Sequence, residues 1–489
     1  MQAELAGSRD VRTHIVLVPG FVGFDALGQL AYYAGVTELF VEFRRRQPHA
    51  QVSLHYFDNF PTASVKLRAR LLQGYLAKRI MRGEFGPRDR VALVGHSTGG
   101  LDIRRALHEL GQGGVVRVDG SCELPKEAVL ARIAHLVFIS TPHFGTNIAD
   151  FWCRFDSTIQ SFVKNAGIGV QLNRDPVAWL RRLLMESLPA TNTGLLLAIA
   201  DALQESDEDR VGSDSRRADE RSARASFALW LEHIGKDFQV IEDLRSSGVD
   251  DLERESPAHF DVAQRRAELA LLRAHHITTR SFATRAPTRP AGRMTTALLE
   301  LLKWGGPLVE GISELSNVAA ERWWLPFISL PAVVGRAALP APSLLAAIVL
   351  LHEHPEIPYD LFYALCADRE GPFKHPGARA PDGIAPTVAP LLAGAPIPSS
   401  ALTAADNDAV VNTLSMLWPY EEAYPEDHPV TLVEGDHGDV IGHYQHRLHH
   451  DPSASGRRYF AYDIFPSGSG FDEARFGEVW RQVFRSCLC

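Results

Sequence analysis

The chain has 489 residues, a formal net charge of −9 and a hydrophobic share of 45%. This length and composition allow a sizeable buried core, and they exclude collagen-like, coiled-coil and wholly disordered proteins. The acidic balance argues against nucleic acid as a partner, because phosphate binding needs a basic surface.

The cysteines and the apolar segments limit the cellular setting. Five scattered cysteines do not suit a disulfide-stapled scaffold, and none has zinc-type C-x-x-C spacing. Residues 1–14 lack the basic and apolar regions of a signal peptide. The most apolar uncharged stretch, Ala337–Leu351, is too short to span a bilayer. We therefore expect no transmembrane segment, and a cytoplasmic location or export without a cleaved signal.

Residues 1–150 alternate strand and helix patterns. The expected strands are short apolar runs at His14–Val18, Gln51–Phe57, Arg90–Val94 and His135–Ser140. The segment Ala63–Ile80 has apolar residues at helical spacing. Near-continuous apolar strands separated by helices predict a parallel sheet covered on both faces, so the fold class is α/β.

The middle of the chain has a different pattern. Residues 151–275 are typical of a helical insertion, in which Glu205–Ala223 is charged enough to be a solvated, flexible loop. A strand is expected at Ile277–Ala286, within a core segment 276–290. These features predict that the core is interrupted and then briefly resumed.

A second insertion is predicted over residues 291–394. Its apolar part, Leu298–Leu351, reads as a helical cap or lid, and a Pro/Gly/Ala-rich connector is expected around Gly371–Pro398. The core returns in residues 395–489, with a strand at Pro429–Glu434. The chain ends in an amphipathic helix whose apolar positions are Phe476, Val479, Trp480, Val483 and Phe484.

The motif Gly95-His96-Ser97-Thr98-Gly99 follows a predicted strand and precedes a predicted helix. A serine on such a turn is strained, and glycines two residues to either side avoid clashes within it. The turn also places the hydroxyl at a helix N-terminus, which favours a developing anion. Ser97 is therefore predicted to be a catalytic nucleophile.

A nucleophilic serine needs an oxyanion hole. The backbone N–H of Thr98, the residue after the nucleophile, is one predicted donor. The loop Val18–Gly23 follows an early strand, and the N–H of Phe21 in this loop is the second.

A base and an acid should follow the serine in the chain. His437 lies just after a strand, between glycines, and is the predicted base. Its rivals are His443, His446, His449 and His450; positions 443, 446 and 450 could share one helix face, either solvated or binding a metal. Asp406 and Asp408 both suit the acid, and we favour Asp408 because it directly precedes an apolar Ala-Val-Val.

Several blocks resemble the bacterial true lipases, which are triacylglycerol ester hydrolases of the α/β-hydrolase fold. The loop Pro19–Gly23 is similar to the family's His-Gly-Leu-x-Gly loop, and Tyr33–Val36 with Leu39 is similar to the Tyr-Gly-Ile stretch behind that loop. Val94–Leu101 is similar to the family's nucleophile elbow. Phe138–Phe151 resembles its Thr-Pro-His-x-Gly segment. Asn407-Asp408-Ala-Val-Val resembles the sequence around its catalytic acid, and Asp436-His437-Gly-Asp439 its histidine block.

The resemblance implies a Ser-Asp-His triad that needs no redox cofactor. It also implies that a structural Ca²⁺ can be present, with Asp439 at one ligand position. Two positions depart from the family pattern. Pro19 stands in place of a histidine before the oxyanion glycine, and Ala409 in place of the glycine after the acid.

The predicted function is hydrolysis of a lipid or acyl ester through an acyl-enzyme intermediate. The apolar lid would suit a long acyl chain and could contact a membrane surface transiently, although a satellite core explains the same pattern. Alternatives are a phospholipase, an intracellular polyester or thioester hydrolase, and a non-catalytic ligand-binding protein on a hydrolase fold. The sequence does not specify the oligomeric state.

Overall fold

The computed structural model describes residues 11–21, 26–27, 30–60, 63–118, 122–150, 243–245, 262–288, 296, 356–367, 387–392, 394–398, 401–403, 405–419, 428–445, 447–450, 458–461 and 463–488. The predicted charged loop Glu205–Ala223 and the apolar part of the predicted lid, Leu298–Leu351, lie outside these residues.

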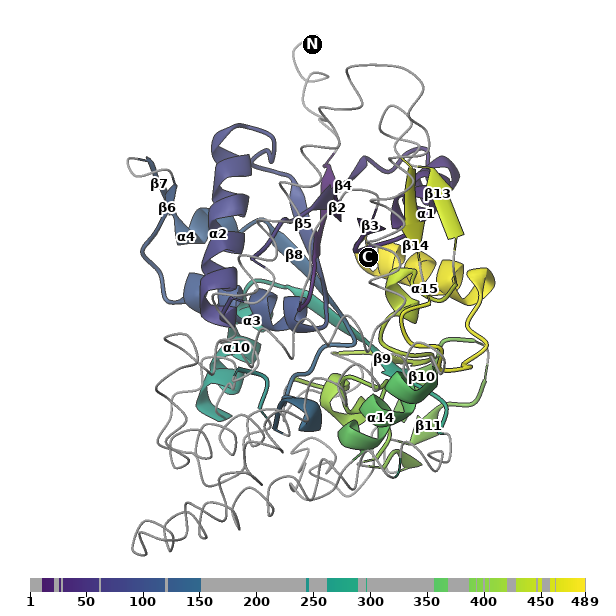
Figure 1. Ribbon diagram of the computed structural model, residues 1–489. Coiled ribbons are helices and arrows are strands. Elements are labelled where there is room, and N and C mark those ends of the chain that lie inside the picture. The colour runs from purple at the N-terminus through teal and green to yellow at the C-terminus, as the bar shows by residue number, and fades with distance from the viewer. Residues whose placement is uncertain are drawn as a thin grey trace, which may run out of the picture.

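An eight-stranded sheet runs through the molecule in the order β11-β10-β12-β9-β8-β5-β1-β4 (Figure 1). Its strands are β1 (Thr13–Val18), β4 (Val52–Tyr56), β5 (Arg90–His96), β8 (Ile133–Ile139), β9 (Thr278–Arg285), β10 (Thr387–Pro390), β11 (Ile397–Pro398) and β12 (Val430–Glu434). Neighbouring strands pair in parallel, except for the antiparallel pair β10–β11. The strands expected from apolar runs all lie within this sheet.

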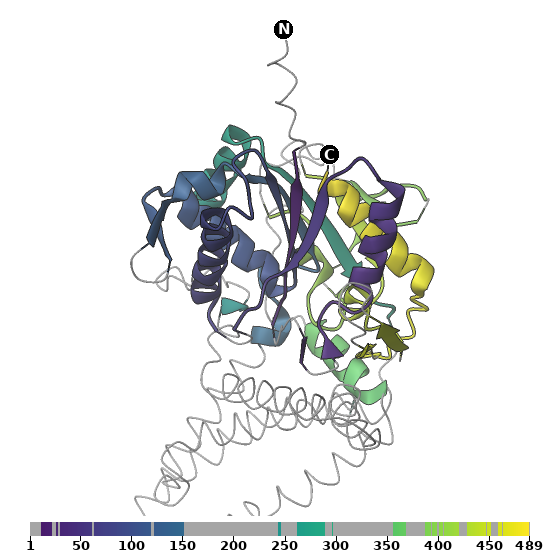
Figure 2. The ribbon, with the colours of Figure 1, turned by 90° about the horizontal axis from the view of Figure 1, so that it is seen from above.

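Helices cover both faces of the sheet (Figure 2). They are α1 (Val36–Arg46), α2 (Val65–Met81), α3 (Thr98–Gly111), α4 (Lys126–Leu130), α10 (Val262–Ala274), α14 (Glu356–Cys366) and α15 (Glu473–Ser486). Side chains of α2, α3, α4 and α10 pack on one face, in a cluster with Val16 and Leu93. Those of α1 and α15 pack on the other, with Leu17 and Val94. The predicted α/β-hydrolase fold, a mostly parallel sheet between helices, is confirmed.

Local sequence explains where two of these helices begin. The Ser64 side chain caps α2 by accepting the backbone N–H of Leu67, and the Asp472 carboxylate caps α15 by accepting that of Arg475. The buried residues of α15 include every apolar position of the predicted amphipathic helix. The Asp472 cap and the apolar periodicity of the following residues therefore both account for helix α15.

Strand β1 marks a reversal in the order of the sheet. The chain passes from β1 to β4 on one side and then crosses to β5 on the other side of β1. At such a switch point the loops that follow the two strands diverge and open a crevice at their carboxyl ends. The loop carrying Phe21 and the turn carrying Ser97 both begin here.

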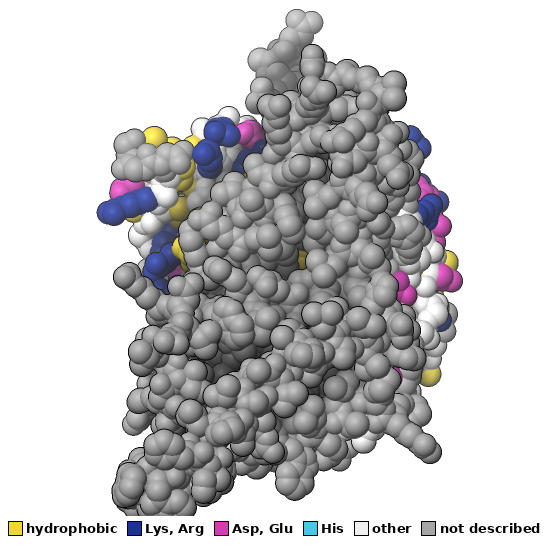
Figure 3. Space-filling model, viewed as in Figure 1, with side chains coloured by type: hydrophobic (Ala, Val, Ile, Leu, Met, Phe, Trp, Pro, Cys, Tyr) yellow, Lys and Arg dark blue, Asp and Glu magenta, His cyan; other side chains and the backbone are white. Residues whose placement is uncertain are grey.

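Smaller elements lie beside the main sheet. They are the hairpin β6 (Val115–Val118) and β7 (Cys122–Pro125), the sheet of β2 (Ala26–Leu27), β3 (Leu30–Ala31), β13 (Arg447–His450) and β14 (Arg458–Ala461), and the 3₁₀ helices η4 (Thr413–Met416) and η5 (Asp439–Ile441). Within the hairpin, Arg117 pairs with Glu123 at 3.0 Å. Figure 3, viewed as in Figure 1, shows both Lys or Arg and acidic side chains at the upper left of the molecule. Of the described helices, none has the length and apolar character that a bilayer crossing requires.

Two local predictions are wrong. The connector predicted around Gly371–Pro398 contains β10 and β11. Pro390 is the last residue of β10 and Pro398 the last residue of the edge strand β11, and a missing N–H is tolerated at a strand end or an edge. The helix face predicted for the histidines after His437 is absent from the described residues. His449 and His450 belong to β13, whose pairing with β14 overrides the helical spacing.

Candidate active site

The elbow after β5 holds Ser97 in a strained conformation, with φ 54° and ψ −130°. The flanking glycines leave room for the turn. A Cβ on Gly95 would lie 2.6 Å from the backbone N of Gly100, and a Cβ on Gly99 would lie 2.3 Å from the carbonyl O of Val18. The sequence-predicted serine thus stands where a sharp strand-to-helix turn lifts it above the sheet edge.

The loop after β1 packs directly against the elbow. A Cβ on Gly20 would lie 2.6 Å from Ser97 Cβ, so only glycine allows this approach. Phe21 follows Gly20, and Thr98 is the first residue of α3. The first N–H groups of a helix lack intrahelical partners and carry partial positive charge. The two predicted oxyanion donors therefore belong to two segments that meet at Ser97.

His437 and Asp408 form a hydrogen-bonded pair. The Nδ1 atom of His437 lies 2.7 Å from Oδ2 of Asp408, and the backbone N–H of His437 donates to the Asp408 carbonyl at 3.1 Å. Asp408 is fully buried, whereas 9% of the His437 surface is exposed. With Nδ1–H directed at the carboxylate, Nε2 of this imidazole is the atom that can accept a proton.

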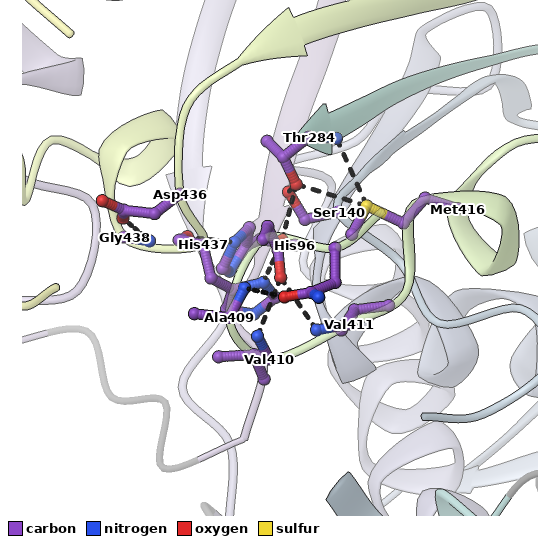
Figure 4. Close-up of polar contacts among 12 residues, drawn as sticks. His96, Ser140, Thr284, Ala409, Val410, Val411, Met416, Asp436, His437 and Gly438 are labelled. Carbon is purple, nitrogen blue, oxygen red and sulfur yellow. Dashed lines mark hydrogen bonds and ion pairs between the residues drawn. The ribbon is translucent and has the colours of Figure 1, made fainter. Parts of the chain in front are cut away.

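Other donors hold the Asp408 carboxylate in place (Figure 4). Its Oδ1 accepts the backbone N–H groups of Val410 and Val411 at 3.0 and 2.8 Å, and its Oδ2 accepts the Thr284 hydroxyl at 2.5 Å. The Ser140 hydroxyl lies 2.8 Å from Thr284 Oγ1 and extends this network. Thr284 and Ser140 were not predicted as site residues, and their positions near the ends of expected strands are the only sequence signal that points to them.

The carboxylate of Asp406 has a different partner from that of Asp408. Its Oδ2 accepts the backbone N–H and the hydroxyl of Thr403, at 2.6 and 2.9 Å. Of the two candidate acids, the structure therefore brings Asp408 to the histidine.

Residues 144–146, which follow β8, are hydrogen-bonded to the loop that carries Asp408 and to the helix after it. The backbone N–H of Phe144 donates to Ser415 Oγ at 3.0 Å, and the Thr146 hydroxyl donates to the Val410 carbonyl at 2.5 Å. This is the segment that resembles the family's Thr-Pro-His-x-Gly block. Its contacts here are structural: they order the loop that carries Asp408.

His96 connects the elbow to the histidine loop. The ring centroids of His96 and His437 are 4.7 Å apart, and Nε2 of His96 lies 3.2 Å from the His437 carbonyl O. Figure 4 shows the two imidazoles side by side. Because His96 directly precedes Ser97, this contact brings the predicted nucleophile and the predicted base to the same edge of the sheet. Burial and the neighbouring His437 lower the pKa of His96 well below its usual value.

The rival histidines have other partners. Nε2 of His443 lies 3.1 Å from the carbonyl O of Ala31, and Nδ1 of His449 pairs with Glu38 at 3.3 Å. His446 lies outside the described residues. Of the histidines described in this region, His437 is the one that contacts Asp408.

Asp436 and Asp439 are two further buried acids beside His437. Asp439 Oδ2 accepts the Asp436 N–H at 2.8 Å and the Ser469 hydroxyl at 2.9 Å. Burial raises the pKa of Asp439 to about 7. Within the described ranges no three His, Cys, Asp or Glu side chains form a metal-binding group. In this structure both carboxylates accept hydrogen bonds from internal donors, and Ca²⁺ at Asp439 stays a prediction.

No protein-family model matches the chain, and no curated protein matches its sequence. Solved structures similar to it include lipase 1 of Pelosinus fermentans, at 15% identity and a TM-score of 0.38 over 88% of this chain and 94% of that one. They also include Staphylococcus hyicus lipase, at 12% identity and a TM-score of 0.37 over 98% of this chain and 94% of that one. A third is the mature Bacillus licheniformis lipase BlEst2, at 12% identity and a TM-score of 0.28 over 60% of this chain and 75% of that one.

Proposed function

We propose that this chain is a serine hydrolase of carboxylic esters, with lipid or acyl esters as its substrate class. Ser97 is the nucleophile, His437 the general base and Asp408 the residue that orients the imidazole. The observation that carries the proposal is the junction of a strained serine elbow with a histidine bonded to a buried carboxylate at the same edge of the sheet.

In this mechanism Ser97 Oγ attacks the ester carbonyl carbon while its proton passes to Nε2 of His437. The carbonyl oxygen becomes negatively charged, and the N–H groups of Phe21 and Thr98 stabilise it. When the C–O bond breaks, the imidazolium returns its proton to the leaving alcohol. Water then attacks the acyl-enzyme by the same route, releasing the acid and regenerating Ser97.

The surroundings of Asp408 support its proposed role. Two backbone N–H groups and a hydroxyl hold this carboxylate in place, and from there it stabilises the imidazolium that forms on His437. No redox cofactor is required in these steps. Residues 151–275 are proposed as one insertion into the core. Residues 291–394, apart from the sheet strand β10 near their end, are proposed as a second insertion that forms a lid over the acyl chain and contacts a membrane surface transiently.

Covalent labelling tests the proposal. A fluorophosphonate probe should label the wild-type protein and should not label Ser97→Ala, because the probe reacts with an activated serine. Ser64→Ala, a matched change at an exposed helix cap, should be labelled like the wild type. An unlabelled wild-type protein, or equal labelling of Ser97→Ala, would overturn the proposal.

Acyl-chain preference tests the substrate class. Hydrolysis of p-nitrophenyl esters of increasing chain length, with and without phospholipid vesicles, should favour long chains and should respond to vesicles. A preference limited to acetate and butyrate would contradict the lid, while leaving the esterase mechanism intact. Activity on phospholipid or on thioester would select between the alternative substrates.

A further inference from the structure

The peptide unit that joins Pro19 to Gly20 is held at both of its polar groups. Its carbonyl oxygen accepts Nη2–H of Arg68 at 3.0 Å, and its N–H donates to the Tyr32 hydroxyl oxygen at 2.9 Å. A peptide unit is planar, so two hydrogen bonds from opposite sides determine its orientation. The next N–H along the chain is that of Phe21, the proposed oxyanion donor.

On the Gly20 side of the peptide, the hydrogen bonds form a chain that ends at the His437 carbonyl, and this end determines which atom donates in each bond. The His437 carbonyl can only accept, so the proton of His96 lies on Nε2, which leaves Nδ1 as an acceptor. The Tyr32 hydroxyl, 2.7 Å from Nδ1, must then donate to it, and its oxygen is left to accept from Gly20. This arrangement requires a neutral imidazole, in agreement with the lowered pKa of the buried His96.

On the Pro19 side of the peptide, a buried ion pair with Asp102 fixes the guanidinium group of Arg68. Arg68 and Asp102 are both fully buried, with Nη2 and Oδ2 2.7 Å apart and Nε donating to the same Oδ2 at 3.0 Å. Asn59 donates to that oxygen at 3.2 Å. A planar guanidinium held this way presents Nη2–H to the Pro19 carbonyl in one direction. Pro19 restricts its own backbone φ as well.

We infer that Tyr32 and Arg68 are positioning residues that clamp the Pro19–Gly20 peptide, and that Tyr32 couples this loop to the His437 backbone through His96. The clamp rests on the proposed function, since it acts on the oxyanion donor. Gly20 N–H is committed to Tyr32, so the oxyanion is left to Phe21 N–H. The clamp aligns that amide before substrate arrives, and it links the oxyanion loop and the base in one hydrogen-bonded chain.

Tyr32→Phe tests the clamp with little change in packing, because only the hydroxyl is lost. We expect kcat to fall about 10- to 100-fold with little change in KM, since the lost alignment matters once the oxyanion forms. The inhibition constant of a phenylboronic acid, whose adduct on Ser97 places a negative oxygen in the hole, should rise by a similar factor. Tyr33→Phe is the matched control: its neighbouring buried hydroxyl donates to the Val18 carbonyl at 2.8 Å.

The outcomes separate the clamp from the proposed function. A wild-type protein that fluorophosphonate does not label overturns both. A labelled wild type with unchanged kcat and boronate affinity in Tyr32→Phe overturns the clamp alone, as does an equal loss in Tyr33→Phe. Should Tyr32→Phe fail to fold, Arg68→Lys decides by the same two measurements. It keeps a charge beside Asp102 but lacks the planar fork that reaches the Pro19 carbonyl at the same time.

Discussion

Two regions of the candidate site are built by different physical means. The elbow, residues 95–100, is made by the absence of side chains, because Gly95, Gly99 and Gly100 each stand where a Cβ would overlap a neighbour. The carboxylate loops, residues 406–412 and 435–443, are made by three buried aspartates that accept backbone N–H groups: Asp408, Asp436 and Asp439.

The difference shows in how each region tolerates strain. Ser97 and Ala409 both have positive φ, 54° and 77°. The elbow surrounds its strained serine with glycines, whereas the acid loop holds its strained alanine by hydrogen bonds, including one from the Ala409 N–H to Asn407 Oδ1 at 2.8 Å. We therefore expect the elbow to fail when atoms are added, and the carboxylate loops to depend on their hydrogen-bond acceptors and on the charge of Asp408.

The largest expected effect is on the carboxylate side. Asp408→Asn should lower kcat by about 10⁴-fold, because an amide stabilises the wrong tautomer of the imidazole and no longer stabilises the imidazolium. Steady-state ester hydrolysis measures this. Asp406→Asn, two residues away and bonded to Thr403, should stay near wild type. Comparable losses in the two variants would contradict the role given to the His437–Asp408 pair.

On the elbow side, Gly95→Ala should lower the free energy of unfolding by about 3 kcal/mol, because its Cβ would meet backbone atoms of Gly99 and Gly100, which cannot move aside. Urea unfolding followed by fluorescence measures this. Gly74→Ala in α2 is the matched control. A Cβ there has no atom within 4 Å and should raise stability by about 0.5–1 kcal/mol. Equal tolerance at the two positions would remove the steric account of the elbow.

The dependence of stability on pH sharpens the comparison. Burial raises the pKa of Asp439 to about 7 and also raises that of Asp436. In the unfolded chain such groups titrate at about 4, so between about pH 4 and 7 the folded protein holds protons that the unfolded chain has released. The free energy of unfolding should therefore fall as pH rises through this window.

Asp439→Asn should remove part of that slope. The amide oxygen can accept from both donors without ionising, so the variant should exceed wild type in stability by about 1–3 kcal/mol at pH 8 and lose this advantage near pH 4. Urea unfolding at several pH values measures it, and Asp472→Asn at the exposed α15 cap should keep the wild-type slope. Parallel curves for Asp439→Asn and wild type would refute the expectation.

The smallest expected effect is at Ala409. Ala409→Gly relieves a left-handed conformation but loses a buried methyl group, so the free energy of unfolding should change by less than about 1 kcal/mol. Ala92→Gly removes an equally buried methyl from β5 without relieving strain, and it should cost about 2 kcal/mol. Thermal unfolding of the two variants measures the difference, and equal costs would mean that Ala409 is not strained.

The features that could be predicted from the sequence depend on residues that lie close together in the chain. Apolar runs placed strands to within a few residues, as in the expected His135–Ser140 against the observed Ile133–Ile139. The glycines around Ser97 predicted the elbow because their steric demand lies within the turn itself. By contrast, β10 and β11 were missed, since their pairing with each other and with β12 decides them rather than any local pattern.

By itself, the sequence determined the alternation of strands and helices, the serine elbow and the choice of His437 as the candidate base. Only the tertiary structure decided the order of the sheet, the partner of His437 and the network around the oxyanion loop. The physical reason is the sequence separation over which each kind of interaction acts. Backbone sterics and hydrophobic periodicity act over a few residues, whereas Thr284 reaches Asp408 across 124 positions and His96 reaches His437 across 341. Contacts of that kind exist only once the sheet has brought the strand ends together.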